Sequence, residues 1–324
     1  MINEPIIEVK HLKKHFPIRE GVFGQETGKL YAVDGVSFTI RKGTIFGLVG
    51  ESGSGKTTVG RTLLGLYTPT AGEVLYQGTD LHSLSASQLR AIRPKIQLVF
   101  QDPYSSLNPR IRIGEAIGEA LLAHKLCTKK ECYEKVIEIM EICGLSRHHY
   151  SRFPHEFSGG QRQRIGIARA LILEPDLVIA DEPISALDVS IQAQIINLLA
   201  DLRDDYQMTC LFISHDLGVV EHLCDDVAVM YLGQIVETAS RDTLFTQPLH
   251  PYTQALLASV PTLDTRMPVT VISGQVPDPS APPVGCRFAS RCPQKQPLCD
   301  NVPPVFTQVT SGHLVACHLF STDI

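Results

Sequence analysis

One stretch of the sequence decides the fold: Gly50-Glu51-Ser52-Gly53-Ser54-Gly55-Lys56-Thr57-Thr58. It matches the phosphate-binding pattern G-x-x-x-x-G-K-[ST]. The apolar run Ile45–Val49 precedes it and a helical pattern, Thr58–Leu66, follows it, which is the context that the pattern requires. Glycines let backbone N–H groups converge on phosphate oxygens, and the helix start adds a favourable dipole. We therefore expect Lys56 to neutralise β- and γ-phosphates and Thr57 to bind Mg²⁺.

Outward from this loop, apolar runs alternate with helical patterns through most of the first 245 residues. The runs expected to form strands are Phe38–Ile40, Ile45–Val49, Ile96–Phe100, Leu177–Ala180, Cys210–Ile213 and Val227–Tyr231. Buried strands with helices between them predict an α/β fold with a largely parallel sheet. Between Ile113 and Arg152, long helical periodicity with charged faces (Glu115–Leu126, Lys129–Cys143) predicts a helical insertion.

Past Arg241 the composition changes and helical periodicity is lost, except around Tyr252–Ser259. Four prolines between Pro277 and Pro283 predict a linker or extended arm over Ser273–Gly285. A compact tail that carries four cysteines is expected to follow it.

Composition limits the classes of function. The net charge is −5 and there is no dense Lys/Arg block, which argues against nucleic acid as a partner. No apolar stretch approaches the roughly 18 residues needed to cross a bilayer, so a role in transport would require separate membrane-spanning partners. Nine cysteines without a secretory signal indicate a reducing compartment.

A second element carries catalytic chemistry. The apolar run Leu177–Ala180 ends in two carboxylates, Asp181 and Glu182. Asp181 is placed to hold Mg²⁺ through water, and Glu182 to polarise the attacking water as a general base. Alone, the pair would be interpreted as solvated acids at a strand end; beside a phosphate loop, catalysis is favoured.

Further segments resemble the motifs of ABC-type ATPases in order and spacing over roughly residues 5–245. They are the signature Phe157-Ser158-Gly159-Gly160-Gln161-Arg162-Gln163, the dimer-contact loop Ser185–Asp188, the histidine switch Ser214-His215-Asp216 and Gln101 at the Q-loop position. The resemblance implies a P-loop NTPase core (residues 1–245) with an N-terminal antiparallel β element and a helical subdomain inserted at about 102–172. A small Cys-containing extension would occupy residues 246–324.

The resemblance also implies residue roles. Lys56, Glu182 and His215 would be catalytic, with His215 contacting the γ-phosphate, and Thr57, Gln101 and Asp181 would hold Mg²⁺. Ser158, Gly160 and Gln161 would meet the ATP bound by a second subunit, so that two chains enclose two ATP molecules.

An aromatic residue upstream of the phosphate loop usually stacks on adenine in this family. Phe16 matches best, following Leu12–His15, and Tyr31 is the alternative because residues 17–30 look like an insertion. Either ring could instead serve packing alone.

Several segments resemble the dipeptide/oligopeptide importer subfamily: Gln101–Pro109, Ala186–Ser190, His250–Leu257 and the cysteine tail. The resemblance implies four kinds of partner: a second ATPase subunit, identical or different; two membrane permeases; and an extracytoplasmic substrate-binding protein. It implies a peripheral position on the cytoplasmic face of the inner membrane. The alternatives are a nickel or glutathione importer, a soluble ABC-type ATPase of translation or DNA repair, and a non-hydrolysing nucleotide sensor.

The tail cysteines Cys286, Cys292, Cys299 and Cys317 could hold a metal centre in a segment too small for its own core. Cys₄ ligation suits zinc or an iron–sulfur cluster, and the spacing matches neither the usual zinc nor ferredoxin patterns. The subfamily resemblance implies a [4Fe–4S] cluster; zinc and reduced structural thiols are the alternatives. His313 and His318 are interpreted as surface or packing residues, with ligand roles as the alternative.

Overall fold

The computed structural model describes residues 4–21, 25–102, 104, 106–259 and 274–321. Pro103 and Ser105 of the subfamily motif, and Ser273 at the start of the predicted linker, lie outside them. The chain forms two compact units, here called the helical unit (Met1–Glu4, Arg41–Thr44 and Leu84–Phe212) and the phosphate-loop unit (Pro5–Ile40, Ile45–Ser83 and Ile213–Ile324). The domain boundary at residue 245, which was inferred from the sequence, remains a prediction.

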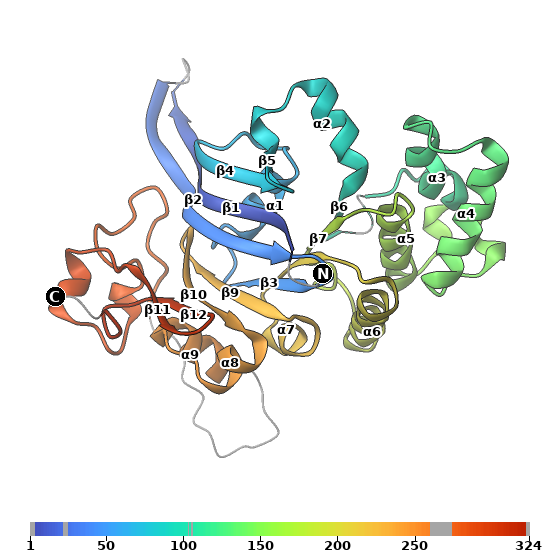
Figure 1. The fold of residues 1–324 in the computed structure, drawn as a ribbon. Helices are drawn as coiled ribbons and strands as arrows, with labels where there is room; N and C mark the ends of the chain where they lie inside the picture. The colour runs from blue at the N-terminus through green and yellow to red at the C-terminus, as the bar shows by residue number, and fades with distance from the viewer. Residues whose placement is uncertain (1–3, 22–24, 103, 105, 260–273, 322–324) are drawn as a thin grey trace. The chain divides into compact units, whose positions relative to one another are not determined.

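The phosphate-loop unit begins with an antiparallel sheet of four strands in the order β2-β1-β4-β5 (Figure 1). The strands are β1 (Pro5–Glu20), β2 (Gln25–Arg41), β4 (Ala71–Tyr76) and β5 (Thr79–Asp80). On β1, the apolar side chains of Ile7, Val9 and Leu12 are buried. The predicted N-terminal antiparallel element is confirmed. Residues 17–20 and 25–30, interpreted from sequence as part of an insertion, form the end of β1 and the start of β2.

A second group of strands in this unit carries the phosphate loop. All five residues of β3 (Ile45–Val49) are buried, and β3 runs parallel to β9 (Asp226–Tyr231). Beyond β9 the order continues with β10, β12 and β11, each antiparallel to its neighbour. The further elements of the unit are α1 (Lys56–Leu63), α7 (Leu217–Leu223), β10 (Gln234–Ser240), α8 (Arg241–Thr246), α9 (Pro251–Ala258), β11 (Phe306–Thr310) and β12 (His313–Ala316).

The strands β3 and β9 agree with the sequence prediction to within one residue, whereas the antiparallel strands and α8 were missed. Four of the five residues of β11 are exposed, so no alternation of apolar and polar residues marks it. Six residues form α8, which is too short to show helical periodicity. The cysteine tail therefore ends in a hairpin that extends the sheet through β10.

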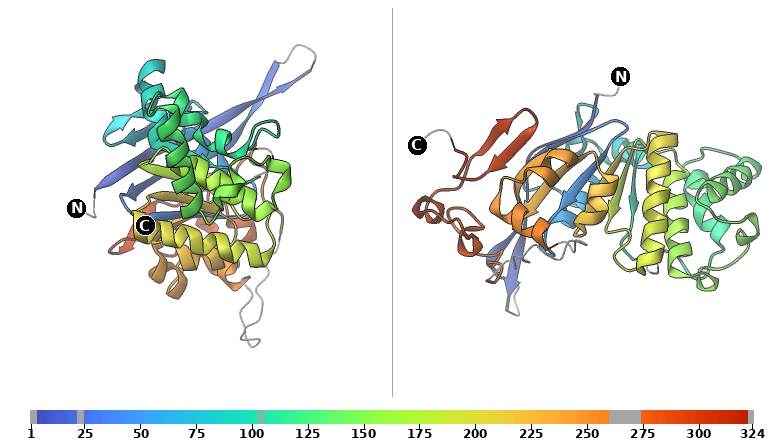
Figure 2. Two further views of the ribbon diagram at one scale, coloured as in Figure 1. Left: turned by 90° about the vertical axis from the view of Figure 1, so that its right-hand side faces the viewer. Right: turned by 90° about the horizontal axis from the view of Figure 1, so that it is seen from below.

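The helical unit contains two parallel strands, β6 (Ile96–Val99) and β7 (Leu177–Asp181), with Ile96 opposite Leu177. Its helices are α2 (Ala86–Ile92), α3 (Ile113–Ala123), α4 (Lys129–Ile142), α5 (Gly159–Leu171) and α6 (Val189–Tyr206). Figure 2 shows α3, α4 and α5 packed on one another, which confirms the helical insertion. The last strand, β8 (Cys210–Ser214), leads from this unit into the other. None of the helices in the described ranges combines the length and apolar character of a membrane span.

Candidate functional site

The phosphate loop depends on glycine at two positions. Gly50 has φ +151°, and a Cβ there would lie 2.0 Å from the carbonyl oxygen of Met230. Gly55 has φ +106°, and a Cβ there would lie 2.1 Å from the carbonyl oxygen of Ala32. Side chains are excluded by both the backbone conformation and the available space. The loop is thus packed closely against β9 and β2.

Lys56 is buried inside this loop, with 4% of its surface exposed. Its Nζ donates to the carbonyl oxygens of Gly50 at 2.7 Å and Glu51 at 2.9 Å. Because α1 begins at Lys56 and its N-cap is Gly55, no capping side chain bonds the first N–H groups of this helix. The Lys56 ammonium and the start of α1, which has no side-chain cap, therefore lie in the same loop. A helix start beside a positive charge is an arrangement that binds phosphate.

The predicted carboxylates form a tight turn in the helical unit. Asp181 is buried at the end of β7. The next residue, Glu182, has φ +48°, a left-handed conformation that costs a non-glycine residue about 1–2 kcal/mol. Strain of this kind is often found at functional sites.

Gln101 reaches this turn from the end of β6. Its Nε2 donates to Glu182 Oε2 at 3.0 Å and lies 3.4 Å from Ser185 Oγ. The amide N–H group thus orients the carboxylate, while the amide carbonyl is the oxygen type that Mg²⁺ binds. The structure therefore brings Gln101 to Glu182, in the turn that follows Asp181.

The signature segment starts a helix with a complete capping box. Ser158 Oγ accepts the N–H of Gln161 at 3.3 Å, and Gln161 Oε1 accepts the N–H of Ser158 at 3.1 Å. Gly160 is buried and lies against Ile191 of α6. The prediction that Ser158 caps this helix is confirmed.

The same helix contacts the chain on both sides of Gln101. Gln163 Nε2 lies 3.4 Å from the carbonyl oxygen of Phe100, and Arg169 donates to the carbonyl oxygen of Ser106 at 2.7 Å. The guanidinium of Arg162 lies 4.0 Å from the ring centre of Tyr104. These contacts join the Gln101 segment to α5.

The other predicted nucleotide contacts belong to the phosphate-loop unit. His215 is exposed directly after β8, and Asp216 caps α7 by accepting the N–H of Gly218 at 3.0 Å. Phe16 is half-buried, with the ammonium of Lys14 4.9 Å from its ring centre. Tyr31 packs against the ring of His15 at 4.6 Å. The predicted residues thus form two sets, one in each unit.

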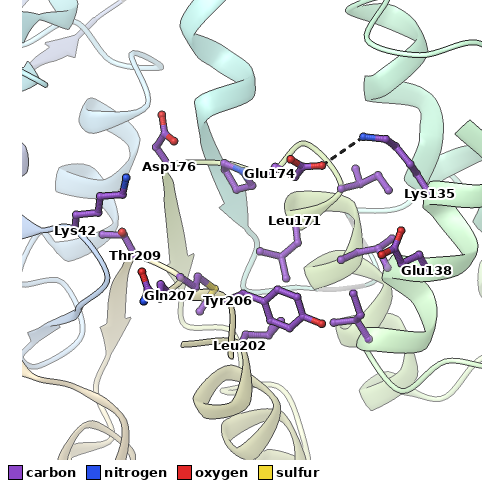
Figure 3. Close-up of a pocket in the computed structure, with 15 residues that line it drawn as sticks. Lys42, Lys135, Glu138, Leu171, Glu174, Asp176, Leu202, Tyr206, Gln207 and Thr209 are labelled. Atoms are coloured by element: carbon purple, nitrogen blue, oxygen red, sulfur yellow. Dashed lines mark hydrogen bonds and ion pairs between the residues drawn. The ribbon is translucent and has the colours of Figure 1, made fainter. Parts of the chain in front are cut away.

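A cavity of about 520 Å³ in the helical unit lies apart from these residues (Figure 3). Leu171, Leu202 and Met208 give it apolar walls, and an ion pair of 3.4 Å joins Lys135 and Glu174 at its rim. None of the predicted nucleotide-binding residues lines it. We therefore assign it no part in the candidate site.

Burial and neighbouring tail cysteines raise the pKa values of Cys286, Cys292 and Cys317. Burial, together with the charges of Cys299, Cys317 and Cys292, raises the pKa of Cys286 to about 11. Burial also raises the pKa of Cys317, with contributions from Cys292 and Cys299. The thiols are therefore close enough for their thiolates to repel one another. Within the described ranges, no group of three or more His, Cys, Asp or Glu side chains forms a ready-made metal site.

The two histidines near Cys317 serve packing. His313 is buried, and its Nε2 lies 2.7 Å from Glu237 Oε1. His318 Nε2 lies 2.9 Å from the carbonyl oxygen of Val302. The Nε2 atom of each ring thus has a hydrogen-bond partner within the protein, which fits the packing interpretation.

Sequence reasoning missed two side chains that contact the phosphate loop. Arg291, which lies between two tail cysteines, binds Glu51 through both terminal nitrogens at 2.8 and 3.0 Å. Tyr252 Oη accepts the backbone N–H of Glu51 at 2.9 Å. Separations of more than 200 residues leave no local pattern that predicts these contacts. The one available signal was that Tyr252 belongs to the subfamily segment His250–Leu257.

Comparison with known proteins fits this geometry. The family model described as "ABC transporter" matches residues 33–185, and the model "Oligopeptide/dipeptide transporter, C-terminal region" matches residues 236–299. The oligopeptide transport ATP-binding protein AppF of Bacillus subtilis is 52% identical over 98% of both chains. The dipeptide transport ATP-binding protein DppF of Escherichia coli is 48% identical over 99% of this chain and 96% of its own.

Solved structures of ATP-binding cassettes also resemble this chain. A dimeric ATP-binding cassette in a post-hydrolysis state with ADP and Pi is 27% identical, with a TM-score of 0.64, over 72% of this chain and 98% of its own. The protein cbiO1 of Clostridium perfringens, part of the ABC transporter complex cbiONQ, is 25% identical, with a TM-score of 0.65, over 75% of this chain and 92% of its own. The glycine-rich loop with its buried lysine and the strained carboxylate turn are thus those of a known class of ATPase, with ATP and Mg²⁺ as its cofactors. This chain belongs to the ATP-binding subunits of ABC transporters.

Proposed function

We propose that this chain hydrolyses ATP to energise the import of dipeptides or oligopeptides. The observation that carries this proposal is the similarity along the whole chain, including the C-terminal region, to proteins named for oligopeptide and dipeptide transport. The cargo itself would be selected by partner proteins, because the residues identified here act on the nucleotide.

In the proposed mechanism, Lys56 neutralises the β- and γ-phosphates, and Thr57, Gln101 and Asp181 hold Mg²⁺. This role requires the Lys56 ammonium to exchange the carbonyl oxygens of Gly50 and Glu51 for phosphate oxygens, which bear more negative charge. Mg²⁺ would neutralise charge that develops on the transferred phosphoryl group.

Glu182 would polarise the attacking water, and His215 would align it on the γ-phosphate. The contact from Gln101 supports this role, because it fixes the orientation of the carboxylate. The residues that follow Glu182 are also held by a side chain. Gln192 donates to the carbonyl oxygens of Ile184 and Leu187 at 3.1 and 3.0 Å. Adenine would stack on Phe16, with Tyr31 as the alternative.

A second ATPase subunit, identical or different, would complete each site. Ser158, Gly160 and Gln161 would present the start of α5 to the γ-phosphate held by the other subunit. The dimeric form of the solved cassette with ADP and Pi supports this arrangement. ATP would then stabilise the closed dimer and hydrolysis would release it.

Two membrane permeases and an extracytoplasmic substrate-binding protein would complete the importer, with this chain on the cytoplasmic face of the membrane. The helical insertion near Gln101 would receive the permeases. Gln163 and Arg169 of α5 contact Phe100 and Ser106, on either side of Gln101, which supports this assignment because it joins the Gln101 segment to the signature helix.

We further propose that Cys286, Cys292, Cys299 and Cys317 hold a [4Fe–4S] cluster. The charges of Cys292, Cys299 and Cys317 raise the pKa of Cys286, which supports this proposal, because a cationic cluster core relieves repulsion among thiolates. Iron and acid-labile sulfide in anaerobically purified protein would agree with a cluster. Bound zinc, or colourless metal-free protein made with adequate iron, would refute it.

The test of function is peptide uptake into proteoliposomes that contain this chain with its permeases, its companion ATPase and the binding protein. Peptides should enter only with ATP, and Glu182→Gln should bind ATP yet lose about 100-fold or more in turnover, since the base is removed. Ion or glutathione uptake in place of peptide would contradict the cargo. Full turnover by Glu182→Gln would contradict the assigned base.

A further inference from the structure

The phosphate loop contains a negative charge where a polyanion should bind. Glu51 is the second residue of the loop, and its backbone carbonyl already accepts the Lys56 ammonium. An uncompensated carboxylate here would repel a triphosphate, most strongly where water is excluded. Its charge must therefore be balanced for the loop to bind ATP well.

Arg291 provides this balance. Its two terminal nitrogens donate to the two carboxylate oxygens of Glu51 at 2.8 and 3.0 Å, which is a bidentate pair. The side chain of Arg291 is 6% exposed and that of Glu51 is 27% exposed, so solvent screens the pair only in part. Arg291 lies in a short 3₁₀ turn, Ala289–Arg291, of the cysteine tail.

A rigid aromatic cluster fixes the direction from which Arg291 reaches the loop. Tyr231, Tyr252 and Phe288 contact one another with ring centres 4.7 to 5.3 Å apart. Arg291 lies 3.3 Å from Tyr231 Oη, and Tyr252 Oη accepts the N–H of Glu51 at 2.9 Å. The tail and the loop are therefore joined at both the side chain and the backbone of Glu51.

We propose that Arg291 is a positioning residue for ATP binding: it neutralises and orients Glu51, so that the C-terminal tail sets the affinity of the phosphate loop. The proposal rests on the proposed function of that loop. It assigns the tail a role in nucleotide binding in addition to any cofactor it holds. Because Arg291 acts before chemistry, it affects the dissociation constant for ATP and not the rate at saturation.

The test compares Arg291→Gln, Arg291→Lys and a matched control, Lys295→Gln, in the full-length protein. Lys295 belongs to the same tail but forms an exposed ion pair with Asp300. Arg291→Gln should raise the Kd for Mg–ATP about 10-fold while kcat at saturating ATP stays within about threefold, since the partly buried Glu51 carboxylate loses its partner. The Kd of Arg291→Lys should lie between those of the wild type and Arg291→Gln, because lysine keeps the positive charge but cannot form the bidentate pair with Glu51. The control should match the wild type.

A double variant separates positioning from simple folding of the tail. Glu51→Gln combined with Arg291→Gln should recover most of the ATP affinity lost in Arg291→Gln, because no unpaired carboxylate remains. Wild-type affinity in Arg291→Gln, or a loss that Glu51→Gln does not relieve, would overturn the inference. Failure of the wild-type chain itself to bind Mg–ATP would instead refute the proposed function.

Discussion

The helices α1 and α5 are the two whose N-termini are predicted to meet phosphate, and their N-caps differ. At α1 the N-cap is Gly55, which offers no side chain to the first N–H groups. At α5 the N-cap Ser158 and Gln161 bond each other's backbone N–H groups reciprocally. The first helix start thus has no side-chain cap, whereas at the second the capping box bonds the N–H groups of Ser158 and Gln161. This difference fits a nucleotide that binds first at α1 and meets α5 of another subunit later.

The largest effect should come from filling the space at the α1 start. Gly55→Ala would bring a Cβ to 2.1 Å from the carbonyl oxygen of Ala32, so the loop must open and ATP binding should fall by at least about 100-fold, the loss of some 3 kcal/mol. Gly53→Ala is the matched comparison: its φ is +79° but nothing lies within 4 Å of the added atom. The ATP affinity of Gly53→Ala should fall only about 10-fold, because the substitution strains the backbone without a steric clash. Equal losses, measured by titration with a fluorescent nucleotide, would contradict the packing argument.

A smaller effect is expected at the α5 start. Ser158→Ala removes the cap and should lower the free energy of unfolding by about 1 kcal/mol. In a Glu182→Gln background it should also weaken ATP-dependent dimerisation about 10-fold, measured by light scattering, with ATP binding by the monomer unchanged. The control is Ser85→Ala, because Ser85 and Gln88 form the same capping box on α2. Similar loss of dimerisation in both variants would refute the role of the signature helix.

The smallest effect concerns a third helix start, which depends on pH. His250 caps α9, and its Nδ1 accepts the N–H of Tyr252 at 3.0 Å. Burial lowers the pKa of His250 from 6.5 to about 3. As the pH falls below 6.5, the unfolded chain takes up a proton that the folded chain refuses, so stability is lost progressively toward pH 3.

His250→Asn keeps a capping oxygen and removes this titration. Between pH 6 and 4, the free energy of unfolding of the wild type should therefore fall more steeply than that of the variant, by up to about 1 kcal/mol per pH unit. Chemical denaturation at several pH values measures both slopes. Parallel slopes would show that His250 is protonated in the folded protein.

The sequence predicted the parts of this molecule that local rules determine. The strand–loop–helix around Lys56, the strand before Asp181 and the cap at Ser158 all follow from short patterns. The pairing of β10 with β12 was missed because it joins segments more than 70 residues apart, and β11 was missed because four of its five residues are exposed. The contact of Gln101 with Glu182 spans 81 residues and that of Glu51 with Arg291 spans 240. Such contacts depend on how the elements pack, and no spacing along the chain encodes them.

The most direct measurement is a crystal structure of the Glu182→Gln variant grown with Mg²⁺ and a nonhydrolysable ATP analogue. We expect the triphosphate on the N–H groups at the start of α1, with the Lys56 ammonium moved from the carbonyl oxygens of Gly50 and Glu51 onto phosphate oxygens. A loop that stays empty at saturating analogue, with Lys56 still bonded to those carbonyls, would contradict the account.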